Sequence, residues 1–152
     1  MKVVDNDEYL PVLQELIEDG KEVSLLISGS SMSPFLIHQR DVIWIKKPDR
    51  KLHTGDMVFY RRVSGAYVMH RIHHIDRSGI YWIVGDAQTE LEPVNPECIF
   101  GLITKVKRKG RQIAPGDFWW EFFARIWIRI IPIRRRMVKI YGKIKNRRNV
   151  CK

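Results

Sequence analysis

The sequence predicts a mainly β domain with a short N-terminal helix and an amphipathic C-terminal helix, on three observations. Residues 23–110 consist largely of short apolar runs separated by glycine-containing turns. Apolar residues at helical spacing precede these runs, and an aromatic segment follows them. We therefore expect an N-terminal part at 1–22, a β-rich body at 23–110 and a C-terminal segment at 111–152.

The first predicted element is a helix over residues 7–19. Its apolar residues recur at helical spacing, and Gly20 supplies a stop signal. The first twenty residues also hold six acidic side chains and no apolar stretch long enough for the core of a secretory signal. The sequence therefore predicts no cleavable signal peptide.

Six strands are predicted in the body. Their ranges are 23–28, 41–46, 56–62, 66–75, 80–84 and 98–107. Ser64-Gly65 and the sequence at 76–79 are typical of tight turns, which indicates mostly antiparallel neighbours. A linker at 111–116 then leads to a helix over Phe118–Ile131, which Pro132 ends or kinks.

The charge of the chain is concentrated at one end. The net charge is +10, but residues 105–152 carry sixteen basic and two acidic side chains. A near-neutral body with a basic tail is therefore favoured over a nucleic-acid-binding domain. Cys98 and Cys151 form no CxxC pair, so a disulfide framework and a Cys/His zinc site are both poorly supported.

The helix predicted over Phe118–Ile131 has a broad apolar face. Its charged residues, Glu121, Arg125 and Arg129, are spaced by four and share one narrow stripe. Fourteen helical residues span about 21 Å, which is less than the hydrocarbon core of a bilayer. We therefore expect peripheral or monotopic membrane association, with the helix in the interface and Arg134–Arg136 on anionic lipid.

Two other interpretations of this segment stay open. The helix could pack on the β-rich body or on a second subunit. Binding of nucleic acid through arginines and aromatic rings is disfavoured, because the aromatic residues and the densest basic run follow one another instead of alternating.

The turn after the first predicted strand carries the candidate chemistry. It reads Ser28-Gly29-Ser30-Ser31-Met32-Ser33-Pro34. A serine nucleophile needs a sharp turn, a nearby base and amides aimed at the developing oxyanion. Glycine permits the unusual backbone angle of such a turn. The alternative is an ordinary turn, for which serine and glycine are also favoured.

His70 is the candidate base. Strand alternation places it on one face with Val68 and Ile72, which predicts a partly desolvated imidazole that stays neutral near pH 7. His74 is expected on the same face and His73 on the opposite one, which disfavours a three-histidine metal site. The alternative for His70 is a structural histidine bonded to a backbone carbonyl.

Five motifs together resemble the type I signal peptidase family, within the S24/S26 group of serine peptidases that includes LexA-like repressors. They are Gly29-Ser30-Ser31-Met32-Ser33-Pro34, Thr54-Gly55-Asp56-Met57-Val58, Val68-Met69-His70-Arg71-Ile72, Val84-Gly85-Asp86 and Ile99-Phe100-Gly101. Their order and spacing cover roughly residues 23–107. The resemblance implies the β-rich catalytic fold of that group.

The resemblance also implies roles in a Ser–His dyad. Ser31, directly before Met32, matches the nucleophile, and His70 stands where bacterial enzymes carry a lysine base. Asp86 is the first candidate for orienting His70, and Glu92 is the second. The implied chemistry needs no metal and no cofactor.

The oxyanion and substrate-binding positions implied by the resemblance are Gly29, Ser30 and Met32. Many family members have a serine where this chain has Gly29, so backbone N–H groups near Ser31 would stabilise the oxyanion. A hydroxyl of Ser28 or Ser30 is the substitute donor.

The sequence thus favours a membrane-associated serine endopeptidase that cleaves signal or leader peptides. Its substrate would be an extended precursor peptide, and no nucleic-acid partner is expected. Two alternatives remain. One is a LexA-like self-cleaving regulator, and the other is a non-catalytic membrane-binding module that keeps the fold.

Overall fold

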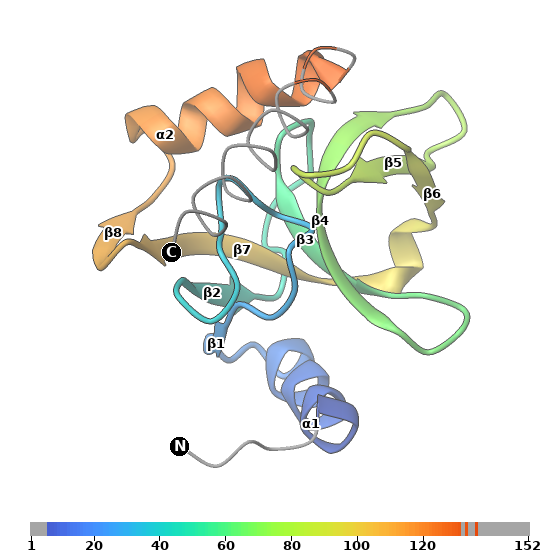
Figure 1. The fold of residues 1–152 in the computed structure, drawn as a ribbon. Helices are drawn as coiled ribbons and strands as arrows, with labels where there is room; N and C mark the ends of the chain where they lie inside the picture. The colour runs from blue at the N-terminus through green and yellow to red at the C-terminus, as the bar shows by residue number, and fades with distance from the viewer. Residues whose placement is uncertain (1–5, 132, 134–135, 137–152) are drawn as a thin grey trace, which may run out of the picture.

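The computed structural model describes residues 6–131, 133 and 136 and confirms a mainly β fold with helices near both ends (Figure 1). Helix α1 spans Asn6–Glu18, and an antiparallel eight-stranded sheet follows within the described residues. The strands are β1 (Val23–Leu26), β2 (Val42–Lys46), β3 (Met57–Arg61), β4 (Tyr67–Ile75), β5 (Tyr81–Val84), β6 (Glu92–Val94), β7 (Ile99–Arg108) and β8 (Arg111–Ile113). The six predicted strands are present, whereas no strand was predicted at β6 or at β8, which lies within the expected linker.

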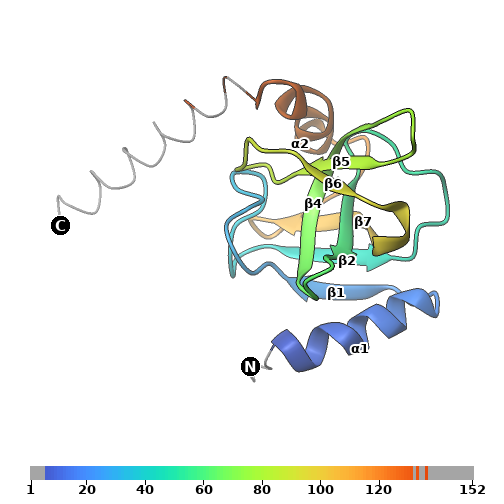
Figure 2. The same ribbon diagram turned by 90° about the vertical axis from the view of Figure 1, so that its right-hand side faces the viewer.

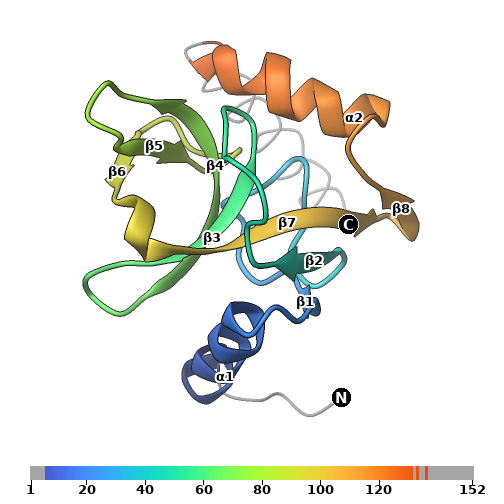
Figure 3. The same ribbon diagram turned by 180° about the vertical axis from the view of Figure 1, so that it is seen from behind.

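The order of the strands explains how distant parts of the chain meet. It runs β1-β2-β7-β3-β4-β5-β6, and β8 pairs with β7. Figures 1 and 3 show that the sheet curls, as twisted sheets of many strands do. The curl lets residues of β1 and β4 line the same pocket, although three strands separate them in the sheet.

Two apolar clusters fill the body. One lies around β3, β4 and β5 and includes Val58, Tyr60 and Ile72. The other joins residues of β2, β3 and β7 to Ile17 of α1 and to aromatic residues beyond Gly116. Figure 2 shows α1 beside β1 and the C-terminal helix at the opposite end of the body.

The C-terminal helix comprises Phe118–Arg129, with α-helical (α2, Phe118–Glu121), π-helical (η2, Phe122–Ile126) and 3₁₀ (η3, Trp127–Arg129) turns in succession. Of the interpretations that the sequence left open for this helix, the described residues show packing on the β-rich body. One face is buried in the core, through Trp120, Phe123, Trp127 and Ile128.

The fit between this helix and the body is close. The ring of Phe35 lies 4.8 Å from that of Phe123 and 6.3 Å from that of Trp120, measured between centroids. A Cβ added to Gly55, which has a φ of +94°, would lie only 2.5 Å from the carbonyl oxygen of Ala124. A glycine is therefore needed where the helix crosses the loop before β3.

Candidate active site

The turn between β1 and β2 presents Ser31 at the surface of a pocket. Gly29 has a φ of +89°, and its N–H donates a hydrogen bond of 2.8 Å to Nδ1 of His38. Met32 is 2% exposed and anchors the turn in the larger apolar cluster. The anchored side chain and the backbone hydrogen bond hold the intervening Ser31 in place, half-buried at the pocket wall.

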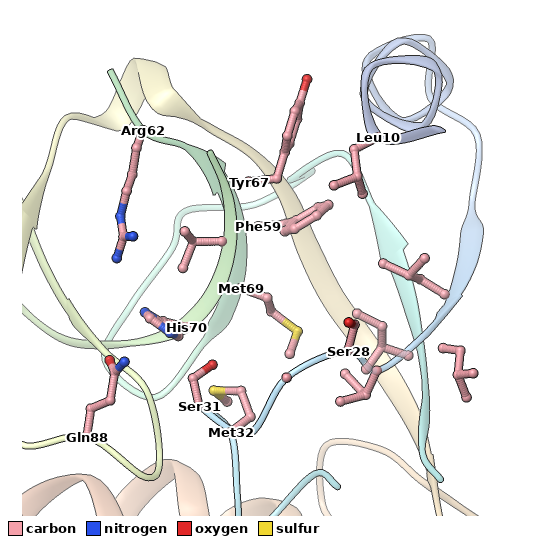
Figure 4. A pocket seen from close by; sticks show the side chains of 16 residues that line it. Leu10, Ser28, Ser31, Met32, Phe59, Arg62, Tyr67, Met69, His70 and Gln88 are labelled. Atoms are coloured by element: carbon pink, nitrogen blue, oxygen red, sulfur yellow. The ribbon is translucent and has the colours of Figure 1, made fainter. Parts of the chain in front are cut away.

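The pocket has a volume of about 400 Å³ and runs between β1 and β4 (Figure 4). Ser31 and His70 lie near one end of it, with Gln88 close by, and Leu10 and Tyr67 lie at the other end. The walls between them are mostly apolar and come from Leu25, Ile27, Ile43, Phe59, Val68 and Met69. The cavity therefore offers an elongated apolar space that leads to the predicted dyad.

Gly85 lies close to both predicted catalytic residues. A Cβ at this position would lie 2.5 Å from the carbonyl oxygen of Ser31 and 3.1 Å from Cδ2 of His70. The N–H of Ala87 also donates a 2.9 Å hydrogen bond to that carbonyl of Ser31. The Gly-Asp motif thus contributes a glycine that lets the serine turn and the imidazole approach each other.

The imidazole of His70 is buried, with 3% exposure, as strand alternation predicted. Burial, with a smaller contribution from the positive charge of Arg62, lowers its pKa from the ordinary 6.5 to about 4, while Glu92 acts in the opposite direction. The ring is therefore neutral and able to accept a proton at any pH well above 4. Among the described residues no hydrogen bond joins it to the Ser31 hydroxyl, and such bonds are often long before substrate binds.

The structure pairs Asp86 with Arg71. Its carboxylate is fully buried and accepts two hydrogen bonds of 2.9 Å from Arg71. Arg71 also donates to the carbonyl of Gly55, and the indole N–H of Trp127 donates to the carbonyl of Asp86. These contacts tie the loop after β5 to the core. Glu92, the second candidate, connects to His70 through the hydroxyl of Tyr60.

Donors for an oxyanion are available on the serine turn. The N–H of Ser31 has no acceptor among the described residues, whereas the N–H of Gly29 is occupied by His38. Ser28 lines the pocket, and Ser30 lies exposed on the outside of the turn. Of the two hydroxyls considered as substitute donors, Ser28 is therefore the better placed.

His73 and His74 depart from the predicted alternation. A register irregularity between Ile72 and His74 interrupts the pairing of β4 with β5. The two rings then contact each other, with their Nδ1 atoms 2.8 Å apart, instead of pointing to opposite faces. Within the described part of the chain no three His, Cys, Asp or Glu side chains form a metal-binding group.

No sequence motif marked Tyr60, Arg62 or Gln88 as residues of the site. Arg62 and Gln88 line the pocket, and Tyr60 lies behind His70. The pairing of Val58 with His70 puts Tyr60 on the same side of β3 as the imidazole. Only this strand register identifies Tyr60 as a neighbour of the imidazole, and the register is not visible in the sequence.

Searches against protein-family models, curated proteins and solved structures found no match to this chain. The chemistry of the pocket therefore has to indicate the function by itself.

Proposed function

We propose that this protein is a serine endopeptidase of the signal peptidase kind, with Ser31 as nucleophile and His70 as general base. The observation that carries the proposal is the pairing of a half-buried serine on an anchored turn with a buried, neutral imidazole across Gly85. Both residues open onto one elongated pocket. A neutral histidine beside a serine hydroxyl is the arrangement that activates the hydroxyl for attack on a carbonyl.

The reaction would proceed through an acyl-enzyme. Nε2 of His70 accepts the proton of Ser31 as its Oγ attacks a peptide carbonyl, and the N–H of Ser31 stabilises the resulting oxyanion. The imidazolium then gives the proton to the leaving amine. Water, deprotonated by the same Nε2, hydrolyses the ester.

The pocket favours an extended peptide as substrate. Among the described strands β1 pairs only with β2 and stands at the end of the strand order, so we expect an extended peptide to add to its outer edge. A peptide that adds to this edge would place alternate side chains against Leu25, Ile27 and Met69. A precursor with small or apolar side chains before the scissile bond fits this environment, as a signal or leader peptide does.

Replacing Ser31 with Ala is expected to reduce peptide cleavage by at least about 10⁴-fold and to abolish labelling by a fluorophosphonate probe, because the acyl-accepting oxygen is lost. Ser33→Ala, on the same turn, is the matched control and should retain labelling and cleavage. Cleavage is measured on a panel of precursor peptides. Equal labelling of Ser31→Ala and wild type would refute the nucleophile, and an unlabelled wild type would favour a non-catalytic module.

We also propose that the outer face of the C-terminal helix docks on an anionic membrane surface. Phe118, Trp119 and Ile126 are exposed on it, with Phe118 at 72%. The chain beyond residue 131 has nine basic and no acidic side chains, so its charge complements anionic headgroups. None of the described helices has the length and apolarity needed to cross a bilayer. Contact in the plane of the interface is the mode that these features support.

The variant Trp119→Ser/Ile126→Ser is expected to bind vesicles of phosphatidylglycerol and phosphatidylcholine at least tenfold more weakly than wild type, because aromatic and aliphatic area no longer enters the interface. Val63→Ser removes a more exposed apolar side chain from the turn between β3 and β4 and should leave binding unchanged. Vesicle co-sedimentation measures both. Unchanged binding of the double variant would contradict this docking surface.

A further inference from the structure

Behind His70 lies a connected chain of polar side chains that reaches the surface. The hydroxyl of Tyr60 lies 3.4 Å from Nδ1 of His70 and donates a 3.0 Å hydrogen bond to Oε2 of Glu92. Arg62 donates two hydrogen bonds of 2.8 Å to the same carboxylate. Tyr60 is 1% exposed, whereas the carboxylate and the guanidinium reach solvent. Sequence motifs pointed to neither Tyr60 nor Arg62.

The ion pair of Glu92 and Arg62 determines the direction of the hydrogen bonds in this series of polar side chains. A carboxylate held by a guanidinium accepts hydrogen bonds only, so the single proton of the Tyr60 hydroxyl points to Glu92. The lone pairs of Tyr60 Oη then face His70, and they can only accept from Nδ1–H. The other ring nitrogen, Nε2, is bonded to Cδ2, which lies on the side of Gly85 and Ser31.

We propose that Tyr60, oriented by Glu92 and Arg62, is a positioning residue that holds His70 as the Nδ1–H tautomer, with the lone pair of Nε2 directed at Ser31. Tyr60 takes the position of the carboxylate that accepts a hydrogen bond directly from the imidazole in a catalytic triad. The role in catalysis rests on the proposed peptidase function, but the tautomer does not.

The charges of Arg62 and Glu92 also act on the pKa of His70. The charged groups that act on the imidazole are Arg62, directly after β3, and Glu92, on β6. Arg62 opposes protonation of the ring and Glu92 favours it, so the two charges of the ion pair shift the pKa of His70 in opposite directions. The phenol of Tyr60, which lies between Glu92 and His70, stays protonated, because burial and the charge of Glu92 raise its pKa well above the ordinary value. Tyr60 can therefore orient the ring without making it strongly basic.

The first test measures the tautomer without any substrate. In ¹⁵N NMR spectra of the full chain at pH 7, with the His70 signals assigned from His70→Gln, wild type should show a protonated Nδ1 and an unprotonated Nε2. Tyr60→Phe removes the acceptor, so the proton should redistribute toward Nε2. Tyr81→Phe, in the same apolar cluster, is the matched control and should leave the tautomer unchanged. A wild-type ring protonated at Nε2, or a Tyr60→Phe ring that keeps the Nδ1 proton, would overturn the proposal.

The second test follows the pKa of His70 by the same spectra and the acid limb of kcat/KM. Arg62→Gln should move both upward from about pH 4, because Glu92 then acts alone, and Glu92→Gln should move both downward. A purely structural role would not produce shifts of opposite sign. Glu90→Gln, an exposed neighbour, is the control. Shifts of the same sign, or none, would contradict the charge arrangement.

The kinetic consequence of Tyr60→Phe is a fall in kcat of about 10–10²-fold with KM nearly unchanged, because the tyrosine lies behind the imidazole and outside the pocket lining. Unchanged kcat in a cleaving enzyme would overturn the positioning role. If wild type cleaves no peptide while the NMR results hold, the peptidase function fails and the tautomer assignment stands.

Discussion

A chain that ends at Gly116 is expected to lose its cooperative fold. The deletion removes four buried side chains, Trp120, Phe123, Trp127 and Ile128, and leaves Phe35 without its aromatic neighbours. Truncating a single buried aromatic residue costs about 3–5 kcal/mol, and a domain has only about 5–15 kcal/mol of stability in total. The loss of several such side chains therefore exceeds what the remaining body can supply.

Urea unfolding followed by near-ultraviolet circular dichroism measures this loss. A chain that ends at Arg136 is the matched control, because it keeps every side chain that the structure places in the core, and it should unfold cooperatively. A soluble, cooperatively folded chain of residues 1–116 would instead support the simpler view of the C-terminal helix as a separable membrane segment.

Breaking the buried pair of Arg71 and Asp86 is expected to have the second-largest effect. Arg71→Met takes away the guanidinium that donates two hydrogen bonds to this buried carboxylate, which typically costs about 3–5 kcal/mol. Asp86→Asn leaves the guanidinium without its counter-charge and should destabilise the protein similarly. The double variant should be more stable than the sum of the two single effects predicts, because both charges of the pair are then removed together.

Equilibrium urea unfolding of all four proteins closes this cycle and separates two roles for Asp86. If Asp86 supports the loop after β5, Asp86→Asn lowers the free energy of unfolding. Its loss of activity then reflects the loss of folded protein, so activity should return at low temperature together with the folded fraction. An Asp86→Asn protein as stable as wild type, yet inactive, would return Asp86 to the role of orienting His70. The electrostatic cycle would then show no coupling.

Local patterns in the sequence were sufficient for much of the fold and for the centre of the candidate site. The six longer strands and α1 follow from apolar periodicity and turn residues, which depend only on neighbours along the chain. The burial of His70 followed from the same pattern, because Val68 and Ile72 share its face. The position of Gly29 in a positive-φ turn beside Ser31 was also visible as a local signal.

Tertiary structure alone decided which partners these residues meet. The irregularity in β4 turned His73 and His74 toward each other, and strands as short as β6 and β8 leave no periodic pattern to detect. Part of the aromatic face that was predicted to contact a membrane lies in the core, because amphipathicity shows that a face is apolar but not what covers it.

The polar contacts of the site show most clearly that local sequence does not indicate which residues come together. Asp86 accepts from Arg71, fifteen positions away, and Tyr60 donates to Glu92, thirty-two positions away. Both pairs form because the curled sheet brings β3, β4 and the segment after β5 together. Residue types along the chain indicate which chemistry is present, whereas the pairing of strands distant in sequence brings Arg71 to Asp86 and Tyr60 to both Glu92 and His70.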